Sequence, residues 1–380
     1  MIRSLLDQPL DTVREVWHAW RFYRENEYIT TTPRYLEERD VTWADPDEGE
    51  PKFIDATGNA PPESMPHLGW HTPVRQYMFM VENATLYGDL PIPLDDQGRI
   101  LWEMLAPRTH FPTNHISLRA LFNQTSDLSL RRFDRPVVVP YTKHRPNYFH
   151  WLFDGLGRLK IIEDAGYQFS DFDYLFCELT SWQSDSLEAI GVPPENCHVL
   201  GGYDLQIESL VVLSGPRVGV TYSSDNLRWL KQRIIDFYID EFPPTKNKDR
   251  IFIKRKESAE RRIFTNKEEV LPALRERGFE DVYLEDLAFP KQVKLFAGSE
   301  VVIGAHGAGL ANLLFCTDAS VVEVFFRKRP MFYWLLAKFN DLNYQYLNAS
   351  DVRGTFNREK GKLDISSTKK ILRNFDMKRT

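Results

Sequence analysis

The stretch Val301-Val302-Ile303-Gly304-Ala305-His306-Gly307-Ala308-Gly309-Leu310-Ala311-Asn312-Leu313 contains the most informative pattern of the chain. An apolar β-branched run ends in small residues around His306, and an apolar helical pattern follows at once. Strand, glycine turn and helix in this order are typical of a phosphate site, because small residues let backbone N–H groups approach an anion and a helix begins with partial positive charge. His306 adds a ring donor, so the sequence predicts an anion site on the loop His306–Leu310.

Three other interpretations compete with a phosphate site. The glycines can simply tighten a turn between a strand and a helix. A nicotinamide site normally uses the turn after the first strand of its fold, whereas this loop is expected after the third strand of its lobe. An esterase oxyanion loop requires a Gly-x-Ser-x-Gly nucleophile turn, and the chain contains none. The last two are disfavoured, and the first stays open.

The residues around this loop alternate between apolar β-branched runs and amphipathic helical patterns. Strands are expected at 251–254, 282–284, 301–303 and 321–325, and helices at 267–277, 290–297, 310–315 and 331–339. Such alternation is typical of a parallel sheet with helices on both faces, so it predicts a Rossmann-like lobe. The basic segment 358–380 is expected to form a closing helix that packs back on the body.

A second lobe of the same type is predicted earlier in the chain. Strands are expected at 137–139, 174–177 and 198–200, and helices at 147–165 and 223–238. Residues before 134 favour loops and hairpins, with strands at 77–90 and 97–104, and the proline- and charge-rich segment 242–249 is the expected hinge. We therefore predict an α/β protein with two Rossmann-like lobes, 1–244 and 245–380, the first with a β-rich extension to about residue 134.

The expected helix 147–165 carries a polar stripe. Asn147 is placed to cap its start, and His150, Asp154 and Arg158 follow at successive i, i+4 spacing. One interpretation is a solvated surface stripe in which Asp154 pairs with Arg158. The other is that Asp154, held by His150, acts as general base on an acceptor hydroxyl.

Basic residues gather where the strand 251–254 is expected to end. Lys254-Arg255-Lys256 and Arg261-Arg262 stand out in an otherwise acidic chain. Cations at the carboxyl end of a strand, in the same crevice as the glycine loop, would neutralise a diphosphate leaving group. We assign this role to Arg255 and Arg262, and expect Lys256 and Arg261 to be solvated.

Composition narrows the classes of function. The net charge of -6 over 380 residues gives no general attraction to nucleic acid, so no nucleic-acid partner is expected. The 3 cysteines do not suggest a disulfide framework, and no apolar run is long enough for a signal peptide or a membrane span. A cytoplasmic protein without a membrane span is therefore expected. Asp171-Phe172-Asp173 imitates a metal motif but precedes its strand, so no metal ligand is assigned.

Three blocks of the chain together resemble glycosyltransferase family 61. They are Asn147-Tyr148-Phe149-His150-Trp151-Leu152-Phe153-Asp154, then Ile253-Lys254-Arg255 with Arg262 and Asn266, then Gly304-Ala305-His306-Gly307-Ala308-Gly309-Leu310-Ala311-Asn312-Leu313. The resemblance runs from about Phe79 to Tyr346, and Gln292 and Glu323 also fit the family pattern. Lys254 departs from it, since many members have serine there.

The resemblance implies a GT-B fold, in which two lobes face a cleft, and inverting transfer from a UDP-sugar such as one of N-acetylglucosamine, xylose or arabinose. It implies no cofactor and usually no bound metal. By the same resemblance, Asn147, His150 and Asp154 match the helix at the reaction centre, with Arg158 also on the acceptor side. Arg255, Arg262, the loop His306–Leu310, Asn312 and Glu323 match the donor side.

The expected reaction is a single displacement in which Asp154, or alternatively His150, deprotonates the hydroxyl of a glycan or glycolipid acceptor. Arg255 and the loop at His306 would stabilise the departing UDP. Synthesis of a surface polysaccharide or glycoconjugate is the expected context. A catalytically inactive scaffold that binds nucleotide or sugar and, less favoured, a dinucleotide-dependent oxidoreductase are the alternatives.

Overall fold

The computed structural model describes residues 28–29, 41–43, 52–53, 70–71, 76–87, 92–96, 100–101, 130–140, 147–201, 205–218, 221–239, 249–256, 261–327, 330–355 and 358–379. The chain forms two compact units, Met1–Gly49 with Pro73–Asn226 and Glu50–Thr72 with Leu227–Thr380. The division after Asn226 lies inside helix α8 (Ser224–Ile239). The expected lobe boundary at 244 and most of the expected hinge lie outside the described residues.

The second unit is built on a five-stranded parallel sheet. Its order is β17 (Phe279–Val282), β15 (Asp249–Ile253), β18 (Ser299–Ala305), β19 (Ser320–Phe325) and β20 (Asn343–Asn348). Counted along the chain this order is 2-1-3-4-5, and it reverses between β15 and β18. Ligands of open α/β sheets bind outside the carboxyl ends of the strands at such a reversal. Arg255 follows one of these two strands and His306 follows the other.

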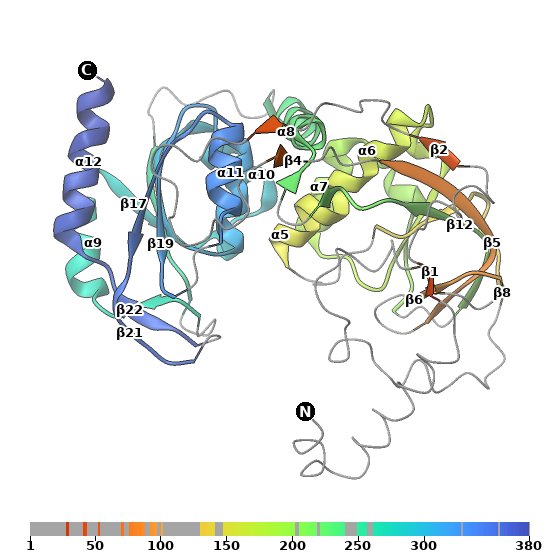
Figure 1. Cartoon of the computed structure of the whole chain (residues 1–380), viewed down its shortest axis with the longest axis horizontal. Helices are drawn as coiled ribbons and strands as arrows, with labels where there is room; N and C mark the ends of the chain where they lie inside the picture. Colours follow the sequence, from red (N-terminus) through yellow and green to blue (C-terminus); the bar gives the residue numbers. More distant parts are fainter. Residues whose placement is uncertain are drawn as a thin grey trace, which may run out of the picture. The chain divides into compact units, whose positions relative to one another are not determined.

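Helices cover both faces of this sheet, as the alternation of the sequence predicts (Figure 1). Helices α9 (Lys267–Arg275) and α12 (Ile365–Arg379) lie on one face, and α10 (Phe289–Gly298) and α11 (Phe332–Phe339) on the other. Leu372 and Phe375 of α12 join the hydrophobic core of the sheet, so the closing helix is confirmed. It begins at Ile365 because part of the preceding segment forms strand β22 (Lys360–Lys362). That strand pairs with β16 (Ile263–Phe264) and β21 (Ser350–Arg353).

Two elements beside the loop differ from expectation. The helix after His306 is a 3-10 helix, η7 (Ala308–Phe315), and every residue from Leu310 to Phe315 is buried. A continuous apolar run indicates burial on all sides but does not distinguish 3.0 from 3.6 residues per turn. The strand expected at 282–284 lies earlier, as β17, and Leu284 opens the 3-10 turn η6 (Leu284–Asp286).

The first unit contains a mixed sheet rather than a purely parallel one. Strand β12 (Leu205–Leu213), which the sequence pattern missed, runs parallel to β9 (Val137–Val138) and antiparallel to β5 (Tyr77–Tyr87). Strands β10 (Asp173–Phe176) and β11 (Cys197–Val199) continue the parallel part. Strands of the N-terminal extension, β5, β6 (Ile92–Leu94) and β7 (Ile100–Leu101), continue the same sheet.

The parallel part of this sheet also has a reversal of strand order. Its order β11-β10-β9-β12 is 3-2-1-4 along the chain, so the reversal lies between β9 and β12. The next described element after β9 is the helix that carries His150. Strand β12 is followed by the hairpin of β13 (Arg217–Val218) and β14 (Thr221–Tyr222).

The helix expected at 147–165 is present, but its middle is not α-helical. It consists of α5 (Tyr148–His150), the π-helical turn η2 (Trp151–Leu156) and α6 (Gly157–Asp164). The side chain of Asn147 accepts hydrogen bonds from the N–H groups of Phe149 and His150, which confirms it as the N-cap. Asp154 lies inside the π-helical turn, a feature that often occurs at functional sites.

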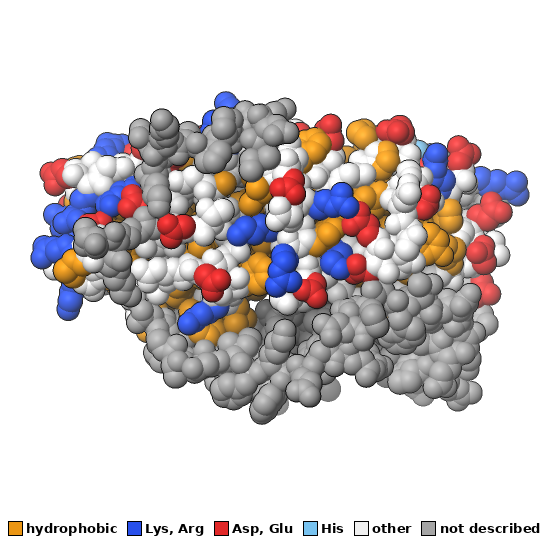
Figure 2. All heavy atoms as spheres, turned by 90° about the horizontal axis from the view of Figure 1, so that it is seen from above, with side chains coloured by type: hydrophobic (Ala, Val, Ile, Leu, Met, Phe, Trp, Pro, Cys, Tyr) orange, Lys and Arg blue, Asp and Glu red, His pale blue; other side chains and the backbone are white. Residues whose placement is uncertain are grey.

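The described surface carries charges of both signs, and the cysteines are not paired in disulfides. Acidic and basic side chains are interspersed over the described part of the face in Figure 2. All 3 cysteines are free thiols, and burial raises the pKa of Cys197 to about 11. None of the helices that the structure describes is long and apolar enough to cross a membrane.

Candidate functional site

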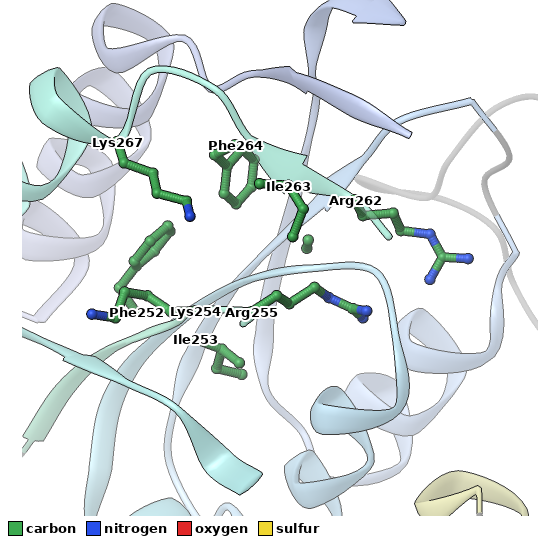
Figure 3. Close-up of a pocket in the computed structure, with 9 residues that line it drawn as sticks. Phe252, Ile253, Lys254, Arg255, Arg262, Ile263, Phe264 and Lys267 are labelled. Atoms are coloured by element: carbon green, nitrogen blue, oxygen red, sulfur yellow. The ribbon is translucent and has the colours of Figure 1, made fainter. Parts of the chain in front are cut away.

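Two arginines of the second unit converge on the backbone of His306. Arg255 Nη2 donates to the His306 carbonyl oxygen at 3.1 Å, and Arg262 Nη1 donates to the same oxygen at 2.6 Å. Figure 3 shows both guanidinium groups extending to the same side of the sheet. Each guanidinium carries five N–H groups, so these bonds use only part of its capacity. The predicted neighbourhood of Arg255, Arg262 and the glycine loop is confirmed.

Burial and nearby charges lower the pKa of both cations. Burial, with a further contribution from the charge of Arg262, lowers the pKa of Arg255 to about 10. Burial likewise lowers the pKa of Arg262, against the opposing effect of Glu359. Arg262 also has a positive φ of 55°, an unusual conformation for a side-chain residue that often marks a functional site. Two cations held together at a cost in solvation form a site for an anion.

Gly307 is required by the position of Arg255. A Cβ atom at residue 307 would overlap the Nη2 atom of Arg255 and approach Arg262 Nη1 to 3.4 Å. At residue 309 a Cβ would meet Leu284 Cδ1 at 2.9 Å. The glycines therefore leave room for a guanidinium and for close packing of the loop, which goes beyond the tightening of a turn.

The ring of His306 is fixed by a buried carboxylate. His306 Nδ1 lies 2.5 Å from Glu323 Oε1, and the hydroxyl of Tyr344 donates to Glu323 Oε2 at 2.6 Å. Glu323 is fully buried, whereas the side chain of His306 is 16% exposed. A carboxylate can only accept, so Nδ1 carries a proton and the ring presents Nε2 to a ligand. Burial and the charge of Glu323 raise the pKa of Tyr344 far above its usual range.

The remaining predicted donor-side residues support the loop. Asn312 is fully buried; its Nδ2 donates to Gln292 Oε1 at 3.0 Å and to the Gly309 carbonyl at 3.3 Å. Leu310 is buried, and its N–H donates to the Gly307 carbonyl at 2.9 Å. Ala308 and Gly309 are partly exposed, so this part of the loop can meet a ligand.

The neighbouring basic residues are used elsewhere, as expected for Lys256 and Arg261. The side chain of Lys256 is 43% exposed and pairs with Asp286, and Arg261 is exposed. Lys254 pairs with Asp281, and its Nζ lies 4.2 Å from the centre of the Tyr283 ring. A cavity of about 10 Å³, lined by residues that include Phe252, Ile263 and Lys267, lies beside the two arginines (Figure 3).

His150 and Asp154 form the matching group in the first unit. His150 Nδ1 lies 2.6 Å from Asp154 Oδ2, and the hydroxyl of Tyr222 donates to Asp154 Oδ1 at 2.5 Å. Asp154 is 1% exposed, whereas the side chain of His150 is 20% exposed. The ring of Phe149 packs edge-on against that of His150 at 5.1 Å. Of the two predicted residues, His150 is the one that a substrate can reach.

The solvated-stripe interpretation of this helix is wrong. Arg158 is 1% exposed and Asp154 is equally buried, because this side of the helix faces the interior of the unit. Asn147 is exposed at the start of the helix. The side chain of Asn226 approaches the backbone of this helix at Gly157, whose carbonyl accepts a hydrogen bond from Asn226 Nδ2 at 2.7 Å.

The structure adds two tyrosines that the sequence pattern did not reveal. Tyr222 lies 68 residues beyond Asp154, and Tyr344 lies 21 residues beyond Glu323. No short-range spacing connects either pair. Tyr222 reaches the helix of Asp154 from the hairpin of β13 and β14, and Tyr344 lies on β20, which pairs with the strand of Glu323.

Asp171 and Asp173 have structural partners. Asp171 accepts from the N–H of Gln168, and Asp173 accepts from the N–H of Arg135 and faces His198 Nε2 at 3.0 Å. Within the described ranges, no group of three or more His, Cys, Asp or Glu residues is arranged to hold a metal ion.

A comparison of the chain with known protein families matches the segment that contains most of these site residues. The family model Glycosyltransferase 61 matches residues 148–322. The matched segment contains His150, Asp154, Arg255, Arg262 and the loop at His306, and it is shorter than the expected 79–346, so Asn147 and Glu323 lie one residue outside its ends. No curated protein was found to match the chain. Residues 148–322 of this mixed α/β chain therefore match the glycosyltransferase 61 family.

Proposed function

We propose that the protein is an inverting glycosyltransferase that moves a sugar from a UDP-sugar to a hydroxyl group of a glycan or glycolipid acceptor. The convergence of Arg255, Arg262 and His306 at the reversal point of the second sheet carries the proposal. A leaving diphosphate needs cations and oriented N–H donors, and these are the groups that gather there.

On the donor side, the remaining N–H groups of Arg255 and Arg262 would bind the diphosphate oxygens. The ring of His306 would join them as an imidazolium, which carries a proton on Nε2 as well as on Nδ1. Glu323 and Tyr344 orient the ring of His306, Gly307 leaves room for Arg255, and Asn312 holds the loop from behind. The partly exposed backbone at Ala308 and Gly309 completes the proposed contact.

On the acceptor side, we propose His150 as the general base, with Asp154 as the residue that positions it. Asp154 is buried, and its two carboxylate oxygens face His150 and Tyr222, which makes direct contact with an acceptor unfavourable. Its negative charge would instead stabilise the imidazolium that forms as His150 takes a proton. Asn147 and Arg158 belong to the same helix, Asn147 at its exposed start and Arg158 in its buried part.

The proposed reaction balances in a single step. The acceptor hydroxyl gives its proton to His150 Nε2 while its oxygen attacks the anomeric carbon of the donor sugar. The bond between that carbon and the UDP oxygen breaks, and UDP leaves with its electron pair toward the arginines. Attack opposite to the leaving group inverts the anomeric configuration.

A GT-B arrangement, in which the two units act on either side of a cleft, is part of the proposal. It is supported by the family match of residues 148–322 and by the reversal of strand order within each unit, since ligands of open α/β sheets bind at such a reversal. A cytoplasmic role in making a surface polysaccharide or glycoconjugate is likewise proposed. The oxidoreductase alternative gains no support, because the turn after the first strand β15 reads Lys254-Arg255-Lys256.

A panel of UDP-sugars tests the proposal. UDP-N-acetylglucosamine, UDP-xylose and UDP-arabinose would each be incubated with the protein and an acceptor extract, and released UDP would be measured. We expect release from at least one donor and its loss by orders of magnitude in Asp154→Asn, with UDP binding retained. UDP binding without release from any donor would support the scaffold alternative, and tighter binding of NAD than of UDP would support the oxidoreductase.

A further inference from the structure

We infer that Tyr222 is a positioning residue for the proton transfer at His150, an inference that rests on the function proposed above. Tyr222 ends β14, far along the chain from the helix that carries His150. Its hydroxyl donates to Asp154 Oδ1, while Asp154 Oδ2 faces His150 Nδ1. One carboxylate is thus held by a tyrosine through one oxygen and holds a histidine through the other.

The hydrogen bond from Tyr222 to Asp154 helps to keep the proton of His150 on Nδ1. Because a carboxylate only accepts, the contact with Asp154 places the proton on Nδ1 and leaves Nε2 as the nitrogen that takes a proton from the acceptor. A carboxylate anchored through one oxygen alone can rotate about its terminal torsion, which has a broad energy minimum. Tyr222 restricts that rotation, and its hydrogen bond stabilises the negative charge of Asp154.

Tyr222 itself is fixed by packing. It is buried, and its ring lies 5.5 Å from that of Phe153 and 6.3 Å from that of Phe149. Both phenylalanines belong to the helix of His150, so the hydroxyl and its target are positioned by the same local core. A Tyr222→Phe variant keeps this packing and removes only the hydroxyl.

The same arrangement of tyrosine, carboxylate and histidine recurs in the second unit. This recurrence argues that the tyrosine helps to position the histidine. There Tyr344 donates to one oxygen of Glu323, and the other oxygen faces His306 Nδ1. The two groups come from different units and use different carboxylic acids. In both, a buried tyrosine anchors the carboxylate that orients a partly exposed histidine.

The experiment compares Tyr222→Phe with Tyr174→Phe. Tyr174 is a matched control in the same unit, since it is buried and its hydroxyl donates to the Phe169 carbonyl at 3.1 Å. For Tyr222→Phe we expect kcat for UDP release to fall by roughly tenfold to a hundredfold, the loss typical of a hydrogen bond to a charged group. KM for the UDP-sugar and Kd for UDP should stay within about twofold, because ground-state donor binding is untouched.

A substrate-free measurement distinguishes positioning from general destabilisation. In protein labelled with ¹⁵N-histidine, the Hδ1 resonance of His150 should shift in Tyr222→Phe, because the charge and orientation of Asp154 change, and should stay in place in Tyr174→Phe. Unchanged kcat and Hδ1 in Tyr222→Phe, with His150→Ala inactive, would overturn the inference and leave the proposed function standing. Full turnover of His150→Ala would overturn the proposed base instead, whatever Tyr222→Phe shows by NMR.

Discussion

The two units contain the same group of three side chains in different surroundings. In each, a partly exposed histidine directs Nδ1 at a buried carboxylate that also accepts from a tyrosine, as His150–Asp154–Tyr222 and as His306–Glu323–Tyr344. Aromatic rings pack against both imidazoles, at His150 and at His306. The difference is that two arginines also bind the backbone carbonyl of His306. We propose that the same arrangement serves two roles that differ in protonation state. It would orient an imidazolium that donates to an anion in the second unit, and a neutral imidazole that accepts a proton in the first.

The largest effect is expected when His150 is removed from the group His150–Asp154–Tyr222. His150→Ala should lower turnover by roughly a hundredfold to ten-thousandfold, the usual contribution of a general base, while UDP binding stays the same. The control is His198→Ala, which removes another histidine paired with an aspartate of the first unit, Asp173. Equal losses in both variants would show that the effect is structural.

The next largest effect is expected on UDP binding, when one of the two arginines beside His306 is removed. Arg255→Ala should weaken UDP binding by about 1.5 to 3 kcal/mol, or roughly tenfold to a hundredfold in Kd, because a charge-assisted contact is lost. Lys256→Ala is the matched control, since Lys256 is the next residue but its side chain is 43% exposed and pairs with Asp286. Isothermal titration calorimetry gives both values, and similar losses would indicate a diffuse charge effect in place of a site.

A smaller effect is expected at Gly307, where a side chain competes with Arg255 for space. Gly307→Ala should weaken UDP binding by roughly threefold to tenfold, since the flexible guanidinium can shift at a modest cost. In an Arg255→Ala background the same substitution should have little further effect, because the overlapping group is gone. Additive losses in the double variant would contradict this explanation.

The smallest effect is the pH dependence of the anion site. With the pKa of Arg255 lowered to about 10, UDP affinity should fall as the pH rises through 10, and Arg255→Ala should abolish this component. Above pH 10, up to the ordinary pKa of an arginine, the unfolded chain would hold more protons at this residue than the folded one. The contribution of Arg255 to the free energy of unfolding therefore rises with pH over that interval. Calorimetry at pH 8, 9 and 10.5 measures the binding component.

The sequence predicted local features of the site better than its long-range contacts. The cap at Asn147, the i, i+4 contact of His150 with Asp154 and the small residues around His306 depend on short spacings, and all are present. The roles of Tyr222 and Tyr344 depend on contacts between elements that lie apart in the sequence, which hydrophobic periodicity does not encode.

The fold shows the same limit. Alternation of strands and helices predicted a doubly wound second unit correctly, and the order 2-1-3-4-5 emerged only from strand pairing. Strand β12 was missed, although it joins the N-terminal strands to the parallel part of the first sheet. The π-helical turn at Asp154 was also unpredicted, because one additional residue per turn barely alters an apolar pattern over six residues.

The division of labour between the two histidines is tested most directly by one paired measurement. UDP affinity by calorimetry and turnover by UDP release would be determined for His150→Ala and His306→Ala under the same conditions. We predict that His150→Ala loses turnover and binds UDP normally, whereas His306→Ala loses UDP affinity. Equal weakening of UDP binding in the two variants, or full turnover of His150→Ala, would contradict the account.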